Sequence, residues 1–143
     1  MIEIFIPGVP PTATAQQKGQ NRRTGAYYKP QNLKEAEAWY MAGLSRDIPK
    51  EPLTGPLVLR VMFGWKATKA HPGGTPKTSR PDTDNAVKLL KDCLTKLRYW
   101  GDDAQVALEL VSKLWADNPG VMVQINTWDE EEKEYGTAEA ETV

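Results

Sequence analysis

Apolar and polar residues alternate in four stretches of the chain, the pattern typical of β-strands with one buried face. Two of these stretches are followed by turn-forming sequences. Residues 7–11 are rich in proline, and Asp-Asn-Pro-Gly occupies 117–120, between the last two stretches. We therefore predict that 105–128 folds as a β-hairpin. The four predicted strands are 2–6, 57–65, 105–115 and 121–126.

Two further stretches carry apolar residues at helical spacing, 33–44 and 83–98. Pro81 prevents an earlier start of the second helix, and Asp82 suits its N-cap. Gly101 is expected to supply a turn with positive φ after that helix. The element order is then β-α-β-α-β-β. It predicts an α+β domain with two helices packed on a mixed or antiparallel sheet.

Length and composition favour a single domain with its own core. A chain of 143 residues is long enough to bury a core without disulfides. With one cysteine, it cannot form a disulfide within itself. Cys93 falls on the apolar face of the second helix, so we expect a small buried hydrophobic residue. His71 is expected to be an ordinary loop residue, and one cysteine with one histidine cannot supply a zinc site. No apolar run approaches the ~18 residues of a membrane span, so we expect a soluble, cytoplasmic protein.

Charge is segregated along the chain, although the formal net charge is only −1. Residues 129–143 hold seven acids and one lysine, a balance of −6, which leaves +5 on residues 1–128. We interpret 1–128 as the folded domain and 129–143 as a solvated acidic tail. A basic body favours an anionic partner, with which the tail would compete.

Two polar stretches of the body, 12–32 and 66–81, contain no acidic residue. Either they are ordinary solvated loops, or they contact the phosphates of a nucleic acid, which we favour. We expect 66–81 to be a flexible basic arm, since the spacing of its glycines does not match a phosphate-binding loop. The candidate DNA-binding residues are Lys18, Arg22, Arg23, Lys29, Lys66, Lys69, Lys77 and Arg80.

Four aspartates lie at the two ends of the second predicted helix, Asp82 and Asp84 at its start and Asp102 and Asp103 after its end. Mg²⁺ prefers such oxygen ligands, and Lys88 lies one turn after Asp84. Alternatively, the acids cap the helix, complement its dipole and pair with Lys88. A helix of sixteen residues spans about 24 Å, so only tertiary structure can bring its two ends together, within one chain or across a subunit interface.

The sequence Arg-Pro-Asp-x-Asp-Asn-x-x-Lys at 80–88, then Asp-x-Leu at 92–94 and Trp-x-Asp-Asp-x-Gln-Val at 100–106, resembles the RusA family of Holliday-junction resolvases. The resemblance implies that Asp82, Asp84 and Asp103 are the essential metal-binding acids and that Lys88 is also required. Asp102 matches a less critical neighbour and is a further candidate ligand.

This resemblance also implies a RusA-like fold and a homodimer that depends on Mg²⁺, with Mn²⁺ as a substitute. The expected activity is endonucleolytic, namely paired symmetric nicks in the opposing strands of a four-way DNA junction during recombination and repair. A two-fold dimer suits a junction with symmetric arms. Two alternatives remain open from sequence: a non-catalytic protein that binds branched DNA with the same fold, and a nuclease that acts on flaps or other branches.

Overall fold

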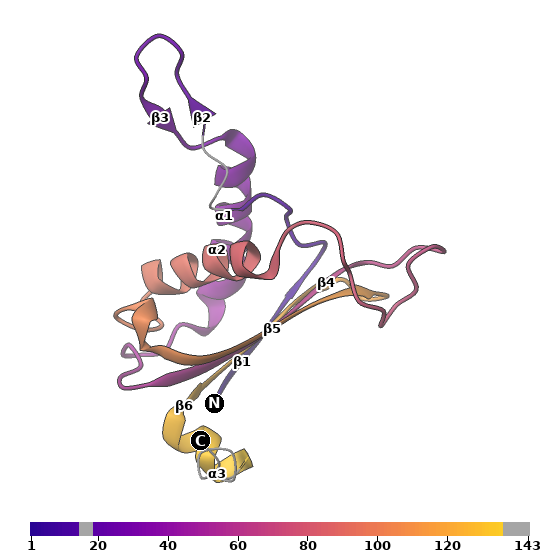
Figure 1. The fold of residues 1–143 in the computed structure, drawn as a ribbon. Helices are drawn as coiled ribbons and strands as arrows, with labels where there is room; N and C mark the ends of the chain where they lie inside the picture. Colours follow the sequence, from indigo (N-terminus) through magenta and orange to yellow (C-terminus); the bar gives the residue numbers. More distant parts are fainter. Residues whose placement is uncertain (15–18, 136–143) are drawn as a thin grey trace.

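The structure is a computed structural model that describes residues 1–14 and 19–135. A four-stranded sheet of order β1-β6-β4-β5 forms its centre, and a two-stranded hairpin, β2-β3, projects beyond one end of α1 (Figure 1). The sheet strands are β1 (Ile2–Pro7), β4 (Leu57–Lys66), β5 (Val106–Ala116) and β6 (Gly120–Thr127), and the hairpin strands are β2 (Gly19–Gln20) and β3 (Tyr27–Tyr28). The helices are α1 (Gln31–Leu44), α2 (Thr83–Lys96) and α3 (Trp128–Tyr135), with short 3-10 turns η1 (Ser45–Asp47) and η2 (Asp103–Gln105).

The mixed sheet confirms the predicted α+β class, but the predicted hairpin over 105–128 is wrong. β4 lies between β5 and β6, pairing with β5 in parallel and with β6 antiparallel, so that Val61 faces Val111 on one side and Val123 on the other. β4 has the most deeply buried strand sequence, which favours a central position. Turn residues at 117–120 therefore carry the chain across the end of β4 rather than into an adjacent strand.

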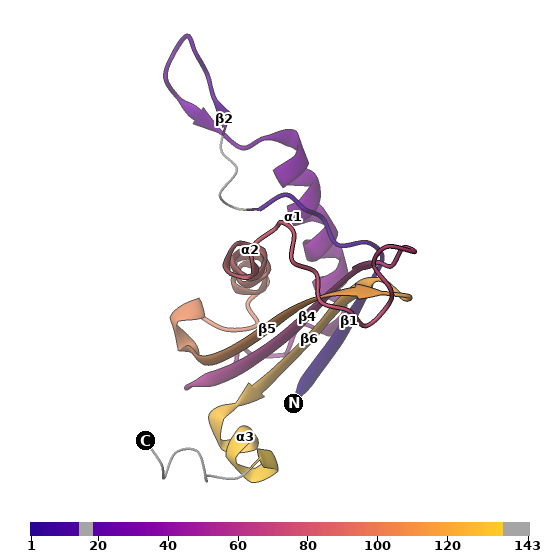
Figure 2. The same ribbon diagram turned by 45° about the vertical axis from the view of Figure 1, so that its right-hand side comes forward.

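The hydrophobic core fills the space between one face of the sheet and helices α1 and α2 (Figure 2). Alternate residues of β4, including Leu59 and Phe63, belong to the same core as Leu90 and Leu94 of α2. Cys93 belongs to this core, and burial raises the pKa of its thiol to about 11. This confirms Cys93 as a buried hydrophobic residue. Among the described residues, no helix is long and apolar enough to cross a membrane.

The other face of the sheet is covered only near one end, where α3 lies across it (Figure 2). Over the rest of this open face, large apolar side chains from all four strands are exposed. They are Phe5, Met62, Leu108, Leu110 and Met122.

Helix α3 occupies the start of the segment that we predicted to be a solvated acidic tail. Its Glu131 is buried, accepts hydrogen bonds from Arg60 and Asn126 of the open face, and forms an ion pair with Arg60. Glu130 pairs with the terminal amine of Met1 at 2.6 Å. The prediction of a solvated tail is thus wrong for 129–135, because Glu130 and Glu131 form ion pairs with groups of the body. Residues 136–143 lie outside the described residues.

Replacing Glu131 with glutamine is expected to lower the free energy of unfolding by about 2 kcal/mol near neutral pH, since Arg60 loses a charged partner. The hydrogen bond from Arg60 lowers the pKa of Glu131. This stabilisation is therefore complete above the unfolded-state pKa and is lost as pH falls through the lower folded-state value. Urea unfolding should show a difference in the free energy of unfolding between the wild type and Glu131→Gln that becomes smaller at acidic pH. Glu134→Gln, at an exposed position, should leave stability unchanged; an equal loss there would contradict the assignment.

Candidate active site

The first acidic pair lies at the start of α2 with its carboxylates unused by the fold. Asp82 occupies the N-cap position, yet its side chain makes no capping hydrogen bond. Asp84 stands exposed in the first turn, and Lys88 is exposed one turn later. Among the described residues, none of these three side chains takes part in a hydrogen bond or an ion pair. The alternative in which these acids cap the helix and pair with Lys88 therefore finds no support in the geometry.

The second acidic pair follows the end of α2. Arg98 adopts the left-handed conformation, with φ of 65°, and its neighbour Tyr99 returns a backbone hydrogen bond to the helix. The prediction that Gly101 supplies the positive φ is wrong, because the chain reverses three residues earlier. Trp100 is then fully buried, and its ring N–H donates to Thr95 Oγ1 at 2.7 Å. This anchor fixes the turn from which the two aspartates extend.

The two adjacent aspartates have different surroundings. Asp102 caps η2, where its Oδ1 accepts a hydrogen bond from the Ala104 N–H at 2.8 Å, and the Gln105 side chain completes a capping box. Asp103 is half-buried and makes no side-chain hydrogen bond or ion pair within the described part of the chain. The fold thus uses Asp102 and leaves Asp103 available, in line with the lesser role that the resemblance implies for Asp102.

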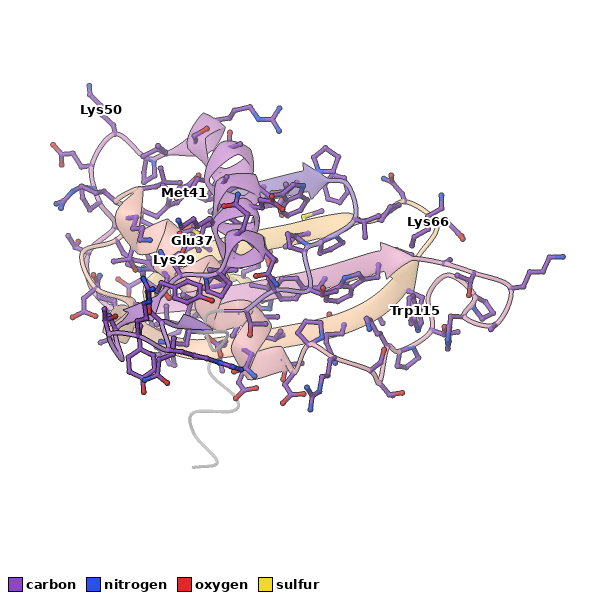
Figure 3. All side chains as sticks on the ribbon, turned by 90° about the horizontal axis from the view of Figure 1, so that it is seen from above. Lys29, Glu37, Met41, Lys50, Lys66 and Trp115 are labelled. Atoms are coloured by element: carbon purple, nitrogen blue, oxygen red, sulfur yellow. The ribbon has the colours of Figure 1, made fainter. Side chains whose placement is uncertain are left out.

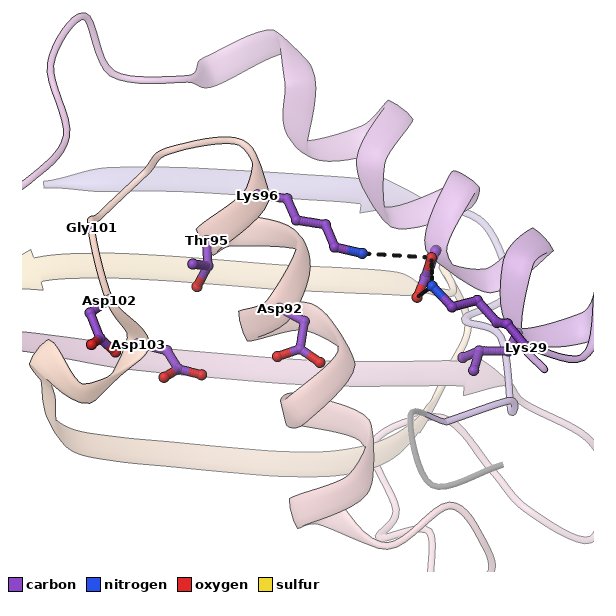
Figure 4. Close-up of a pocket in the computed structure, with 9 residues that line it drawn as sticks. Lys29, Asp92, Thr95, Lys96, Gly101, Asp102 and Asp103 are labelled. Atoms are coloured by element: carbon purple, nitrogen blue, oxygen red, sulfur yellow. Dashed lines mark hydrogen bonds and ion pairs between the residues drawn. The ribbon is translucent and has the colours of Figure 1, made fainter. Parts of the chain in front are cut away.

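An open pocket of about 480 Å³ lies beside this turn. Asp92 of α2 and Asp103 point into it from neighbouring elements, with Thr95 between them (Figure 4). Asp92 was not among the predicted site residues. Its position eight residues after Asp84 and four after Lys88 was the available signal, because positions four apart share a helix face. Lys29, Lys96 and Glu37 form the opposite rim of the pocket.

The acids predicted to bind the metal do not converge within one chain. Asp82 and Asp84 lie at the start of α2, whereas Asp103 follows its end, and the fourteen-residue helix between them spans about 21 Å at ~1.5 Å per residue. No three acidic, histidine or cysteine side chains of residues 1–14 and 19–135 are close enough to hold one metal ion. The carboxylates suit a hard divalent cation chemically, but a single chain does not assemble all three around one.

The basic residues of the N-terminal loop lie on the projecting hairpin. Arg22 and Arg23 are exposed at its tip, and the rings of Tyr27 and Tyr28 are 72% and 57% exposed beside them. Lys29 instead forms an ion pair with Glu37 of α1 at 2.8 Å (Figure 3). Lys18 lies outside the described residues.

The predicted flexible arm, 66–81, is bound to the edge of β5. Backbone hydrogen bonds join Lys77 to Lys113 and Thr75 to Trp115. Lys77 is only 7% exposed, and its ammonium donates to the Arg80 carbonyl and stands over two tryptophan rings. Lys77 is therefore a structural residue, which corrects the prediction of a DNA contact. The exposed cations of the arm are Lys66 (Figure 3), Lys69 and Arg80.

Comparison with known proteins identifies a family for this chain. Residues 8–126 match the profile of a family described as Endodeoxyribonuclease RusA. The chain belongs to the RusA family. The chain is 37% identical over 95 residues to the crossover junction endodeoxyribonuclease rusA of Lactococcus phage r1t. The matched residues cover 65% of this chain and 72% of the phage protein. It is also 31% identical over 127 residues to the uncharacterized protein YqaN of Bacillus subtilis (strain 168), covering 80% of this chain and 89% of YqaN.

The matched residues, 8–126, begin directly after β1 and include β4, β5, all but the last residue of β6 and both core helices. The α+β architecture described above is therefore the fold of this family in the present chain. Nucleases of the RusA family are metal-dependent. The carboxylates at both ends of α2 that have no partner among the described residues are of the chemical type that a hard divalent cation prefers.

Proposed function

We propose that this RusA-family protein is a Mg²⁺-dependent endodeoxyribonuclease that cuts opposing strands of a four-way DNA junction in the cytoplasm, during recombination and repair. One observation carries the proposal. Asp82, Asp84, Lys88 and Asp103 are charged side chains to which the fold assigns no partner within the described residues. Charged side chains that make neither a hydrogen bond nor an ion pair contribute little to stability, so a role in chemistry accounts for them better than a structural one.

The proposed roles follow from the chemistry of each side chain. Asp82, Asp84 and Asp103 supply carboxylate oxygens for Mg²⁺, for which Mn²⁺ can substitute, and the ion supplies charge neutralisation at the cleaved phosphate. Lys88 has no competing ion pair in the described chain, so its ammonium can contact a phosphate oxygen and offset negative charge that develops there. Asp102 stays with its cap and acts on the neighbouring Asp103 by fixing the turn.

Binding of the junction is assigned to two basic surfaces. The hairpin β2-β3 offers Arg22 and Arg23 to phosphates, and the exposed rings of Tyr27 and Tyr28 beside them suit stacking on unpaired bases. Lys66, Lys69 and Arg80, the exposed cations of the arm, are assigned to the second surface, and Arg80 lies two residues before Asp82. The hairpin β2-β3 and α2 lie on one side of the sheet, whereas α3 lies on the other side (Figure 1). The acids of α3 are thus poorly placed to compete with DNA.

The decisive experiment is cleavage of a synthetic four-way junction. We expect paired nicks in opposing strands with Mg²⁺ or Mn²⁺ and none with a chelator. A linear duplex and a flap of the same sequence are the controls for structure selectivity. Equal cleavage of flap and junction would point to a general branch nuclease, and binding without cleavage in either metal would point to a non-catalytic protein.

Paired nicks in opposing strands require two active sites, so the proposal includes a homodimer. Sedimentation at micromolar concentration should show a dimer, free or with junction bound. A monomer in both conditions would contradict it.

Replacing Arg22 and Arg23 together with alanine is expected to weaken junction binding about tenfold at low salt and to reduce the salt slope by nearly two, because two phosphate contacts are lost. Cleavage at saturating enzyme should stay nearly unchanged, since neither side chain lies near the acids. Fluorescence anisotropy across a salt series measures both quantities. The double variant Arg46→Ala with Lys50→Ala removes two exposed charges elsewhere and is the matched control. If this control weakens binding equally, the hairpin contributes only the general attraction between positive charge and DNA.

A further inference from the structure

We infer that Lys77 and Lys113 are positioning residues for the first acidic pair, because their ammonium groups hold the backbone that leads into Asp82. This inference rests on the proposed function, in which Asp82 and Asp84 act on a metal ion. The backbone concerned is that of residues 79–81, the last part of the arm that joins the end of β4 to the start of α2 (Figure 2). It belongs to no helix or strand, so no regular hydrogen-bond pattern fixes its course.

Three consecutive carbonyl groups of this segment each accept a hydrogen bond from a lysine. Lys113 Nζ donates to the Ser79 carbonyl at 2.8 Å and to the Pro81 carbonyl at 2.7 Å. Lys77 Nζ donates to the intervening Arg80 carbonyl at 2.8 Å and also to Ser79 Oγ. The two ammonium groups therefore fix the orientation of three planar peptide units in a row, the last of which leads into the N-cap residue of α2.

The two lysines are themselves held in place by the core and by β5. The buried Lys77 ammonium lies 5.2 Å from the ring centroid of Trp65 and 4.9 Å from that of Trp115. Trp65 belongs to the hydrophobic core, and its ring N–H donates to the Pro10 carbonyl at 3.0 Å. A backbone hydrogen bond of 3.0 Å from the Lys77 N–H to the Lys113 carbonyl joins the two lysines. The segment before α2 is thus attached to the most rigid part of the domain.

Charge on these two side chains is costly where they lie. A buried ammonium normally has a carboxylate partner, because an unpaired charge loses free energy when it leaves water. Neither Lys77 nor Lys113 forms an ion pair with an acid of residues 1–14 and 19–135. Burial, and secondly the charge of Lys113, lower the pKa of Lys77. Packing alone would be served as well by uncharged side chains, so the hydrogen bonds to the backbone account for the two charges.

The helix fixes the backbone of Asp82 from its other side. The Asp82 carbonyl accepts a hydrogen bond from the Ala86 N–H at 3.0 Å, whereas its carboxylate makes no capping hydrogen bond. Asp84 follows in the first turn of the same helix. A fixed backbone with free carboxylates presents both acids to a cation in one orientation. Removal of groups that orient metal ligands typically costs about 10–100-fold in metal affinity or activity.

Lys113→Met tests this role, because methionine keeps the length of the side chain and removes the ammonium. Residues 79 and 80 are exposed, so water can reach the released backbone and the protein should remain folded. We expect Mn²⁺ to bind about tenfold more weakly to the DNA-free protein, measured by electron paramagnetic resonance. Single-turnover cleavage at saturating DNA should fall about tenfold, with junction affinity unchanged. Lys113→Arg keeps a charged donor and should restore most of both losses.

Lys91→Met is the matched control. Lys91 is also a half-buried lysine that links α2 with β5, but it does so through an ion pair with Glu109 at 2.9 Å and bonds to no carbonyl of residues 79–81. This variant should bind Mn²⁺ and cut as the wild type does. Lys77→Met is the second test variant, since a methionine sulfur also packs well against the two indole rings. It should show the same two losses as Lys113→Met.

Three results would overturn the inference. Unfolding of both test variants by circular dichroism, or folded variants that bind Mn²⁺ and cut like the wild type, would show that the lysines only support the fold. Tighter Mn²⁺ binding would show that they act on the cation by charge alone. Weaker junction binding with an unchanged rate at saturation would show a contact with DNA. If the wild type itself neither binds Mn²⁺ nor cuts the junction, the proposed function fails, and the inference fails with it.

Discussion

Junction cleavage by the Asp84→Asn protein is expected to fall by roughly 100-fold or more in Mg²⁺, with the same loss in Asp82→Asn and Asp103→Asn. Asparagine keeps the size of each side chain and removes the charge that holds a cation. Because the wild-type carboxylates make no hydrogen bond or ion pair in the described residues, thermal stability should not change. Binding of the junction should be equal or tighter, since a charge that repels phosphate has gone.

Single-turnover cleavage and anisotropy on the same samples separate these two effects. Asp129→Asn, an exposed acid of α3 on the other side of the sheet, is the control and should cut normally. Lys88→Ala should also lose most cleavage with a modest loss of binding, whereas Lys34→Ala on α1 should lose neither. If the three aspartate variants cut at the normal rate, the acids serve only the helix termini and the protein is not a nuclease of this mechanism.

Replacing Trp100 with alanine is expected to cost about 3–5 kcal/mol in the free energy of unfolding, the range for losing a large aromatic side chain from a packed core. Trp100 is fully buried, its backbone bridges Leu53, and its ring N–H is bonded to Thr95. Since domains of this size are stabilised by about 5–15 kcal/mol in total, the variant should approach the threshold of unfolding.

Urea denaturation followed by circular dichroism measures this loss. Trp100→Phe retains most of the apolar volume and loses the hydrogen bond to Thr95, so it should cost clearly less and remain folded. Because Trp100 fixes the turn that carries Asp103, Trp100→Phe should also lower the cleavage rate at saturating DNA. A Trp100→Ala protein as stable as the wild type would mean that the ring is not packed as described.

Local patterns in the sequence were reliable where a single segment decides its own structure. Alternation in 57–65 and helical spacing in 83–98 led to β4 and α2 with ends shifted by one or two residues, because the periodicity of burial is a local property. The helix end was less well predicted. Glycine is the usual left-handed residue, but here Arg98 takes that conformation so that Tyr99 and Trp100 enter the core.

Predictions that depended on neighbours far along the chain failed for identifiable reasons. The turn residues at 117–120 predict a reversal of the chain, but they do not indicate that β4 lies between β5 and β6. The basic character of Lys77 concealed its burial over Trp65 and Trp115, and the acidic character of 128–135 concealed the partner that Arg60 offers to Glu131. In each case the deciding contact joins residues distant in sequence.

The sequence by itself determined the four strands of the sheet, the two core helices, the α+β class, the family motif and the identity of the charged residues at both ends of α2. These follow from side-chain chemistry and spacing within short segments. Only the tertiary structure decided that Asp82, Asp84 and Asp103 have no partners in the described chain, that Asp92 joins the pocket, and that α2 keeps the two acidic pairs apart. The reason is physical: a helix sets the distance between its own ends, but which surfaces lie beside those ends depends on packing of the whole chain.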